Sequence, residues 1–404
     1  LGDVYKRQPQ MMGLRTQFVH LWVCDQTEKS NDTFEDYGLF TQVEQLNKTA
    51  LKAHGLDKNG HLYKVNSFDF HRYEDTIKLA DDPDYNQASF EGMLEIKGDS
   101  DHTKLIEMLD ALNDESQKID DVLDTYFDSE NLVYWLAFQI LTGNCDTQNR
   151  NCYLYSPLNS NTWYFLDWDN DGMLRKLELS LTGFSDYASW ERGVSNYWGN
   201  VLFNRALRSK SFRGELDRAV KDLRSYLTET RLTKMIKHYR EVTESLVFAS
   251  PDIDHLPVTK DQYGQIAAAI PSEIEENYKS FRESFKKPMP FYIGVPQIDN
   301  GKLRINWDAS YDFEARDIRY TVELARDYAI SDVVFKAEDV LLPEVTCDAP
   351  DAGQYFVRVR ATNSDGYRQD AFDYYMTDDG KHYGMKCFYV QDGGKVVEDT
   401  YEEG

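Results

Sequence analysis

The amino-acid sequence predicts an α+β chain in two parts, a region of mixed strands and helices followed by an all-β sandwich. Apolar residues recur at helical spacing over residues 216–227 and 232–246, which indicates two amphipathic helices. After residue 287, apolar and polar residues alternate in short runs separated by polar turns. The clearest of these runs are 303–307, 320–324 and 355–361. Short strands at this spacing are typical of a sandwich of about ninety residues.

The first part of the chain has three candidate strands and one buried helix. Arg15–Val23 alternates between two faces, and Tyr37–Val43 and Leu62–Val65 are further strand candidates. The run Leu132–Leu141 is apolar on nearly every face but is too short to span a bilayer. We therefore predict that it forms a buried helix, which ends at Gly143.

A β-hairpin with an acidic loop on each side is predicted after this helix. Asn151–Tyr155 and Thr162–Leu166 are rich in strand-forming residues and are joined by turn residues. Asp146 precedes the hairpin, and Asp169 and Asp171 follow it. Because Asp146 comes just after the buried helix, we expect the helix to fix its position.

The order of these residues is suited to phosphoryl transfer. This reaction needs a carboxylate that orients the attacking hydroxyl, and oxygen ligands that hold Mg²⁺ against the nucleotide phosphates. Asp146 and Asn151 form an Asp-x4-Asn pair, and Asp169 lies beyond the hairpin. This is the spacing of the catalytic and metal loops of a protein kinase, without the usual His-Arg before the first Asp or Phe-Gly after the second.

The same residues resemble the spore-coat H kinase-like (CotH) family. Its pattern Gly-Asn-x-Asp, Asn and Trp-Asp-x-Asp is present as Gly143–Asp146, Asn151 and Trp168–Asp171. Tyr37–Glu44 and Gly60–Lys64 look like other parts of that family, so the resemblance covers about residues 14–285. It implies a two-lobed, atypical protein-kinase-like domain that uses ATP and Mg²⁺ or Mn²⁺. Its partial amino lobe would be residues 9–115 and its helical carboxy lobe residues 116–287.

The resemblance also implies roles for individual residues and a class of substrate. Asp146 would be the catalytic aspartate, and Asn151 and Asp169 would converge as metal ligands, with Asp171 or Asp167 close enough to help. The substrate would be a Ser or Thr hydroxyl of a cell-surface, coat or secreted protein.

Nucleotide binding in a kinase amino lobe normally uses a strand lysine paired with a glutamate. Lys64 and Glu44 are the candidates for this pair. A surface ion pair, or no contact between them, is an equally open interpretation. The opening Leu1–Gln8 resembles translated sequencing-adapter sequence, so we expect it to be non-native and the family's amino-terminal nucleotide-contacting segment to be missing.

Calcium is the main alternative for the second acidic loop. Residues 167–178 satisfy the D-x-[DN]-x-[DN]-G-x5-E pattern, with Glu178 at the twelfth position. An EF-hand needs a helix before this loop, whereas Thr162–Leu166 has the composition of a strand. In an extended segment the three alternating carboxylates would point the same way, about 7 Å apart, and would require a cation. A solvated acidic loop is the third interpretation.

Composition excludes several classes of function. The 404 residues carry a net charge of −25, with 70 acidic and 45 basic residues, so nucleic acid and anionic membranes are poor partners. An aromatic content of 14% excludes a disordered chain. No run reaches transmembrane length, and no signal peptide is visible. Five scattered cysteines without a CxxC argue against structural zinc, and leave open whether Cys145 and Cys152 form a disulfide.

The last part of the chain resembles a fibronectin type III module. Gly353–Asn363 is similar to the sixth strand of such modules, in which the tyrosine, here Tyr355, forms a corner hydrogen bond. We predict an immunoglobulin-like sandwich over residues 288–376, followed by a hairpin and tail over 377–404. Such a module is a spacer or binding unit, and its usual occurrence on exported proteins suggests an extracellular or cell-surface location.

Two functions therefore remain open for this chain. One is an ATP-dependent protein kinase that acts as a monomer. The other is a catalytically inactive surface-binding protein, with a calcium-binding acidic loop at 167–178. The joint presence of Asp146, Asn151 and Asp169 favours the kinase, because a binding protein does not need these three residues in this order.

Overall fold

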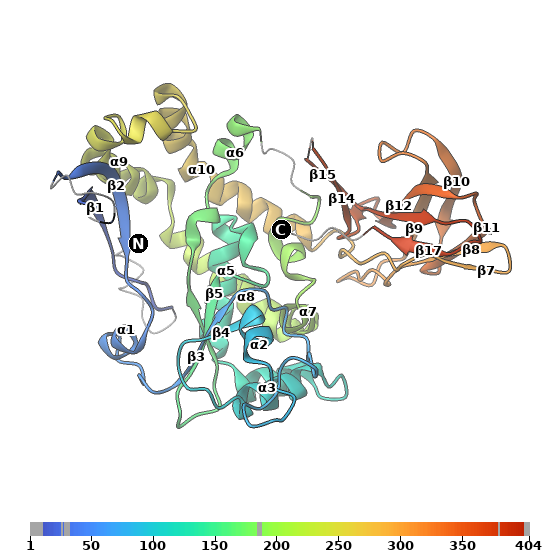
Figure 1. The fold of residues 1–404 in the computed structure, drawn as a ribbon, viewed down its shortest axis with the longest axis horizontal. Coiled ribbons are helices and arrows are strands. Elements are labelled where there is room, and N and C mark those ends of the chain that lie inside the picture. The colour runs from blue at the N-terminus through green and yellow to red at the C-terminus, as the bar shows by residue number, and fades with distance from the viewer. Residues whose placement is uncertain (1–10, 26, 28–32, 184–187, 379, 400–404) are drawn as a thin grey trace. The chain divides into compact units, whose positions relative to one another are not determined.

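The structure is a computed structural model that describes residues 11–25, 27, 33–183, 188–378 and 380–399 (Figure 1). The chain divides into two compact units. Unit 1 comprises Leu1–Ser185 and Asn200–Tyr278, and unit 2 comprises Asp186–Gly199 and Lys279–Gly404. Unit 1 combines helices with antiparallel sheets, and unit 2 contains a β-sandwich. This confirms the predicted α+β fold class, while the prediction for Leu1–Gln8 lies outside the described residues.

Unit 1 contains two antiparallel sheets and most of the helices. Its strands are β1 (Thr16–Val23), β2 (Glu35–Val43), β3 (His61–Val65), β4 (Leu94–Ile96), β5 (Cys152–Ser156) and β6 (Tyr164–Asp167). Strands β1 and β2 pair as a ribbon, and the other sheet has the order β4-β3-β5-β6. The predicted strands at 15–23, 37–43 and 62–65 and the predicted hairpin are all present.

The α-helices vary in length from single short turns to long amphipathic elements. They are α1 (Lys48–Ala53), α2 (Gln87–Met93), α3 (Thr103–Asn113), α4 (Ile119–Tyr126), α5 (Ser129–Thr142), α6 (Lys176–Thr182), α7 (Val201–Arg208), α8 (Lys210–Tyr226), α9 (Glu229–Val247) and α10 (Lys260–Ser284). The 3-10 turns are η2 (Cys145–Thr147), η3 (Asn170–Gly172), η4 (Gly193–Tyr197) and η5 (Asp252–His255). Helices α8 and α9 correspond to the two predicted amphipathic stripes.

Helix α5 is the central element of unit 1. The Asp128 carboxylate caps its first turn by accepting a hydrogen bond from the Asn131 backbone N–H, at 2.8 Å. Gly143 ends it with a left-handed φ of 66°, a conformation that costs a glycine little. Its Trp135 indole stacks on Phe203 and packs against Phe165 of β6. The predicted buried helix that ends at Gly143 is therefore confirmed.

A buried amide of this helix, Asn131, attaches the β5–β6 hairpin to it. Asn131 donates from Nδ2 to the Phe165 carbonyl at 3.0 Å, and its Oδ1 accepts from the Phe165 N–H at 2.7 Å. The strand register places Cys152 opposite Asp167. The start of β5 and the end of β6 therefore lie side by side. The loop that contains Asp146 ends near this point, and the loop that contains Asp169 begins there.

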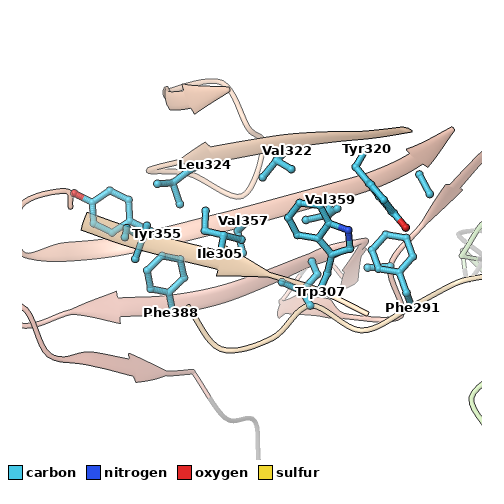
Figure 2. Close-up of a cluster of buried hydrophobic side chains, with 14 of the residues drawn as sticks. Phe291, Ile305, Trp307, Tyr320, Val322, Leu324, Tyr355, Val357, Val359 and Phe388 are labelled. Atoms are coloured by element: carbon cyan, nitrogen blue, oxygen red, sulfur yellow. The ribbon is translucent and has the colours of Figure 1, made fainter. Parts of the chain in front are cut away.

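Unit 2 is built around a two-sheet sandwich. Its strands are β7 (Gln297–Asp299), β8 (Lys302–Asn306), β9 (Ile318–Ala325), β10 (Val333–Val340), β11 (Glu344–Asp348), β12 (Gly353–Asn363), β13 (Arg368–Asp370), β14 (Tyr374–Thr377), β15 (Gly380–Tyr383), β16 (Met385–Val390) and β17 (Val396–Glu398). One sheet has the order β11-β8-β7, and the other has the order β10-β9-β12-β16-β17 with β13 beside β12. Figure 2 shows the buried side chains of this core.

The core of the sandwich has aromatic residues at both of its ends. Trp307, Tyr320 and Phe291 gather at one end, and Tyr355 and Phe388 lie at the other (Figure 2). The Tyr355 hydroxyl donates to the Asp351 carbonyl at 3.0 Å, which is the corner hydrogen bond predicted from the sequence.

The sandwich extends further along the chain than the sequence predicted. Strand β16 pairs with β12, and β17 pairs with β16, so the sheet continues beyond the predicted limit at residue 376. Phe388 and Val390 are buried in the core, which explains why this segment joins the sandwich instead of forming a separate tail. Residues 186–199, assigned from sequence to the carboxy lobe, also belong to unit 2, where the Val194 N–H donates to Ser284 Oγ.

The corner hydrogen bond makes a testable contribution to the stability of the sandwich. We expect Tyr355→Phe to lower the free energy of unfolding by about 1 kcal/mol, because the Asp351 carbonyl loses a donor. Urea unfolding measures this loss. Tyr367→Phe, which removes a hydroxyl from an exposed ring, is the control and should have little effect. Equal stabilities of the two variants would contradict the prediction.

Candidate active site

Asp146 is presented by a short turn just after α5. The Asn144 side-chain oxygen accepts a hydrogen bond from the Asp146 N–H at 3.4 Å, at the start of η2. Thr147 is buried, and its hydroxyl donates to the Asn144 carbonyl at 3.2 Å. These two hydrogen bonds hold the backbone of the turn in place. The Asp146 side chain is half exposed, so its carboxylate is accessible.

The structure brings Asn151 and Arg150 to the Asp146 carboxylate. Asn151 has a left-handed φ of 59°, and its Nδ2 donates to Asp146 Oδ2 at 2.8 Å. Arg150 Nε lies 3.3 Å from Asp146 Oδ1. The residues predicted as catalytic aspartate and metal ligand are therefore direct neighbours, and a guanidinium that sequence reasoning missed accompanies them.

Asp167 points into the protein and not toward this cluster. It is 9% exposed, and Gln139 Nε2 donates to its Oδ1 at 2.9 Å. Burial raises the pKa of the Asp167 carboxyl to about 7, against the opposing effect of the hydrogen bond from Gln139. In this conformation Asp167 is a structural carboxyl of the core, and the expectation that it helps at the metal site is not supported.

Asp169 lies in the same electrostatic environment as Asp171 and Asp146. Burial raises the pKa of Asp169, and the negative charges of Asp171 and Asp146 raise it further, whereas Lys64 lowers it. Asp169 has a left-handed φ of 55°, and η3 follows it directly. The acidic segment is thus a tight turn, so its carboxylates do not alternate as they would in an extended segment.

Lys64 and Glu44, the candidates for the nucleotide-binding pair, have separate neighbours in the structure. Lys64 on β3 lies with its Nζ 5.8 Å from the Trp168 ring centroid, close enough to Asp169 to affect its pKa. Glu44 instead accepts from His54 Nε2 at 2.8 Å and from the Arg15 N–H at 3.1 Å. Glu44 is therefore paired with His54 and Arg15, and not with Lys64, in this structure. The nucleotide-binding role of both residues remains a prediction.

The calcium-loop alternative is not supported by the local structure. The segment before the loop is the strand β6, whereas an EF-hand has a helix there. Glu178 lies on α6 and accepts from Arg175 Nη2 at 2.9 Å. Among the residues that the structure describes, no group of three or more His, Cys, Asp or Glu side chains is placed to hold a metal ion.

Comparison with protein families decides the classification. The family model described as CotH kinase protein matches residues 5–281, about two thirds of the chain. The chain belongs to this family. The match includes both acidic loops and the β5–β6 hairpin.

Other comparisons add little to the CotH assignment. A comparison with curated proteins found no match. A solved structure described as the twitchin kinase region from C. elegans (Fn31-NL-kin-CRD-Ig26) is similar at 18% identity with a TM-score of 0.18. That match covers 24% of this chain and 20% of the other, and it carries no argument here. Within the described ranges, no helix has the length and apolar character needed to cross a membrane.

The donor atoms of the CotH site suit a magnesium ion that is shared with a nucleotide. Carboxylate and amide oxygens are the protein ligands of Mg²⁺, which commonly takes one or two carboxylates plus phosphate oxygens. Asp169 supplies a carboxylate, and Asn151, whose Nδ2 bonds to Asp146, can offer its Oδ1.

Gly172, which the sequence pattern includes only as the glycine of the acidic loop, has a packing role in the structure. A Cβ added at this position would lie 2.6 Å from Asn144 Oδ1 and 3.6 Å from Asp146 Cβ. The absence of a side chain therefore allows the turn after Asp169 to pack directly on the Asp146 loop. The only sequence signal for this role is its place as the glycine that ends the acidic segment.

Substituting Gly172 tests this close packing. We expect Gly172→Ala to lower the free energy of unfolding by about 1–3 kcal/mol, because the methyl group overlaps Asn144. Gly214→Ala, on α8 and with nothing within 4 Å of the added carbon, should instead gain about 0.5–1 kcal/mol. Urea unfolding of both variants measures the difference, and a stabilising Gly172→Ala would contradict the packing described.

The buried carboxyl of Asp167 makes stability depend on pH. Between its ordinary pKa of 3.8 and the native value of about 7, the native state binds more protons than the unfolded state. Its contribution to the free energy of unfolding therefore falls as pH rises through this window, by at most about 1.4 kcal/mol per pH unit. Asp167→Asn should remove this slope. Urea unfolding at several pH values, without metal ions, compares the two proteins; identical slopes would contradict the prediction.

Proposed function

We propose that this protein is an ATP-dependent protein kinase that transfers the γ-phosphoryl group to Ser or Thr hydroxyls of a protein. The observation that carries the proposal is the direct contact of Asn151 with Asp146, beside the turn that contains Asp169. Membership of the CotH kinase family supports the kinase class. The acceptor type and the acceptor protein are parts of the proposal that rest on the resemblance alone.

Asp146 is the residue suited to orient the attacking hydroxyl. Its carboxylate is half exposed and is held by Asn151 and Arg150 on its two oxygens. The hydroxyl oxygen forms a bond to the γ-phosphorus while the bond to the leaving ADP oxygen breaks, and the hydroxyl proton passes to the carboxylate. The positively charged guanidinium of Arg150 lies beside the Asp146 carboxylate and helps to orient that carboxylate.

Asn151 and Asp169 are suited to hold the metal ion, with Asp171 beside them. Mg²⁺ or Mn²⁺, when bound, would neutralise negative charge on the β- and γ-phosphates. The raised pKa of Asp169, which burial and then its acidic neighbours cause, indicates that a cation would be favourable at this position. Lys64 is the nearby basic side chain on β3 that could contact phosphate oxygens.

The wider setting of the kinase is also part of the proposal. The net charge of −25 suits a basic or polar protein substrate better than nucleic acid. The sandwich of unit 2, with its Tyr355 corner, supports a fibronectin type III-like module that acts as a spacer or binding unit. A cell-surface or extracellular location, and a monomeric state, complete the proposal.

Transfer of labelled phosphate from ATP tests this function directly. We expect the full-length protein with Mg²⁺ or Mn²⁺ to phosphorylate a protein acceptor or itself. Asp146→Asn and Asp169→Ala should each lower the rate by about 10²–10⁴-fold, since one removes the proton acceptor and the other a metal ligand. Asp124→Asn, at an exposed position on α4, is the control. Undiminished transfer by both site variants, or no transfer by the intact protein, would contradict the proposal.

A further inference from the structure

Two buried amide side chains connect the two acidic loops. We propose that Gln139 and Asn144 are positioning residues, which hold the Asp146 loop and the metal loop in a fixed relation to each other. The inference rests on the proposed function for the identity of the site. The contacts that carry it are independent of any bound nucleotide or metal.

Gln139 uses both ends of its amide. It lies on the last turn of α5 and is 1% exposed. Its Nε2 donates to Asp167 Oδ1 at 2.9 Å, and its Oε1 accepts from Asn144 Nδ2 at 3.0 Å. One side chain thus joins the end of β6, where the metal loop begins, to the residue that starts the Asp146 turn.

Asn144 extends the connection in both directions. It is 2% exposed, and its Oδ1 accepts from the Asp146 N–H at 3.4 Å. Its Nδ2 also lies 3.5 Å from Asn170 Oδ1, between Asp169 and Asp171. Gly172 packs on the same amide, since an added Cβ there would meet Asn144 Oδ1 at 2.6 Å. Asn144 therefore touches the backbone of one loop and the turn of the other.

The three hydrogen bonds of this chain all run in the same direction. The Asp146 N–H donates to Asn144, Asn144 donates to Gln139, and Gln139 donates to the buried Asp167 carboxyl. Hydrogen bonds in such a series polarise one another, so the loss of one member weakens the others. Amides suit the two middle positions, Asn144 and Gln139, because an amide can accept on one side and donate on the other.

Asn131 provides a comparison on the same helix. It is also a buried amide, and it bonds to the backbone of Phe165 on β6 through both of its ends. Its contacts secure the hairpin, whereas those of Gln139 and Asn144 reach the residues that border the proposed metal ligands. Loss of either amide removes buried hydrogen bonds, so both variants should be less stable. Loss of Gln139 should, in addition, disturb the metal ligands.

Mn²⁺ binding distinguishes a positioning role from a merely structural one. The probe is Mn²⁺ alone and Mn²⁺ with ATP, measured by calorimetry on the folded full-length protein. We expect Gln139→Met, which has nearly the same volume, to weaken Mn²⁺ binding by about 10–100-fold, as the loss of residues that orient metal ligands does. Asn131→Leu should keep the affinity of the wild type. Asn144→Ala, which removes both the acceptor for Asp146 and the donor to Gln139 without adding charge, should behave like Gln139→Met.

The possible outcomes separate this inference from the kinase proposal. Equal Mn²⁺ affinities of Gln139→Met and Asn131→Leu overturn the positioning role, and if Gln139→Met does not fold, Asn144→Ala decides in its place. Normal Mn²⁺ binding by the wild type without phosphate transfer contradicts the kinase proposal alone. A wild type that binds no Mn²⁺, with or without ATP, overturns both.

Discussion

Helix α5 holds the hairpin through Asn131 and determines where the acidic loops lie through Gln139 at its carboxy end. Asn131, near its start, fixes the middle of β6, and Gln139, near its end, bonds to the last residue of the same strand. Since Gly143 ends the helix immediately afterwards, the turn that carries Asp146 starts from a rigid point. The buried interface between α5 and β6 therefore fixes both the strand and the loops. Each buried amide in it needs a hydrogen-bond partner.

The electrostatics of the site follow from this placement. Asp146, Asp169 and Asp171 are brought close enough that like charges, together with burial, raise the pKa of Asp169. Arg150 and Lys64 supply the positive charge that the protein itself places nearby. Asp167 does not belong to this group of charges, because its carboxyl is buried and accepts a hydrogen bond from Gln139. A site with this balance is suited to a divalent cation, which is what phosphoryl transfer requires.

Sequence patterns identified the elements better than the directions of side chains. The apolar run before Gly143 and the hairpin composition after Asn151 predicted α5, β5 and β6, because local periodicity and turn residues report local structure. The orientation of Asp167 was missed, since alternation along a strand assumes an extended chain, and the chain turns at Asp169. The partner of Glu44 was missed because long-range pairing leaves no local signal. The continuation of the sandwich through β16 was missed for the same reason.

The sequence by itself determined the α+β class, the buried helix, the hairpin, the corner tyrosine and the residues from which the candidate site is built. These depend on interactions within a few residues or on a motif that retains its spacing. The tertiary structure alone decided that Asn151 bonds to Asp146, that Arg150 joins them and that Gln139 and Asn144 connect the two loops. Such contacts depend on how α5 packs against β6. That packing has to give the buried polar groups of the whole unit hydrogen-bond partners at the same time, so no short segment encodes it.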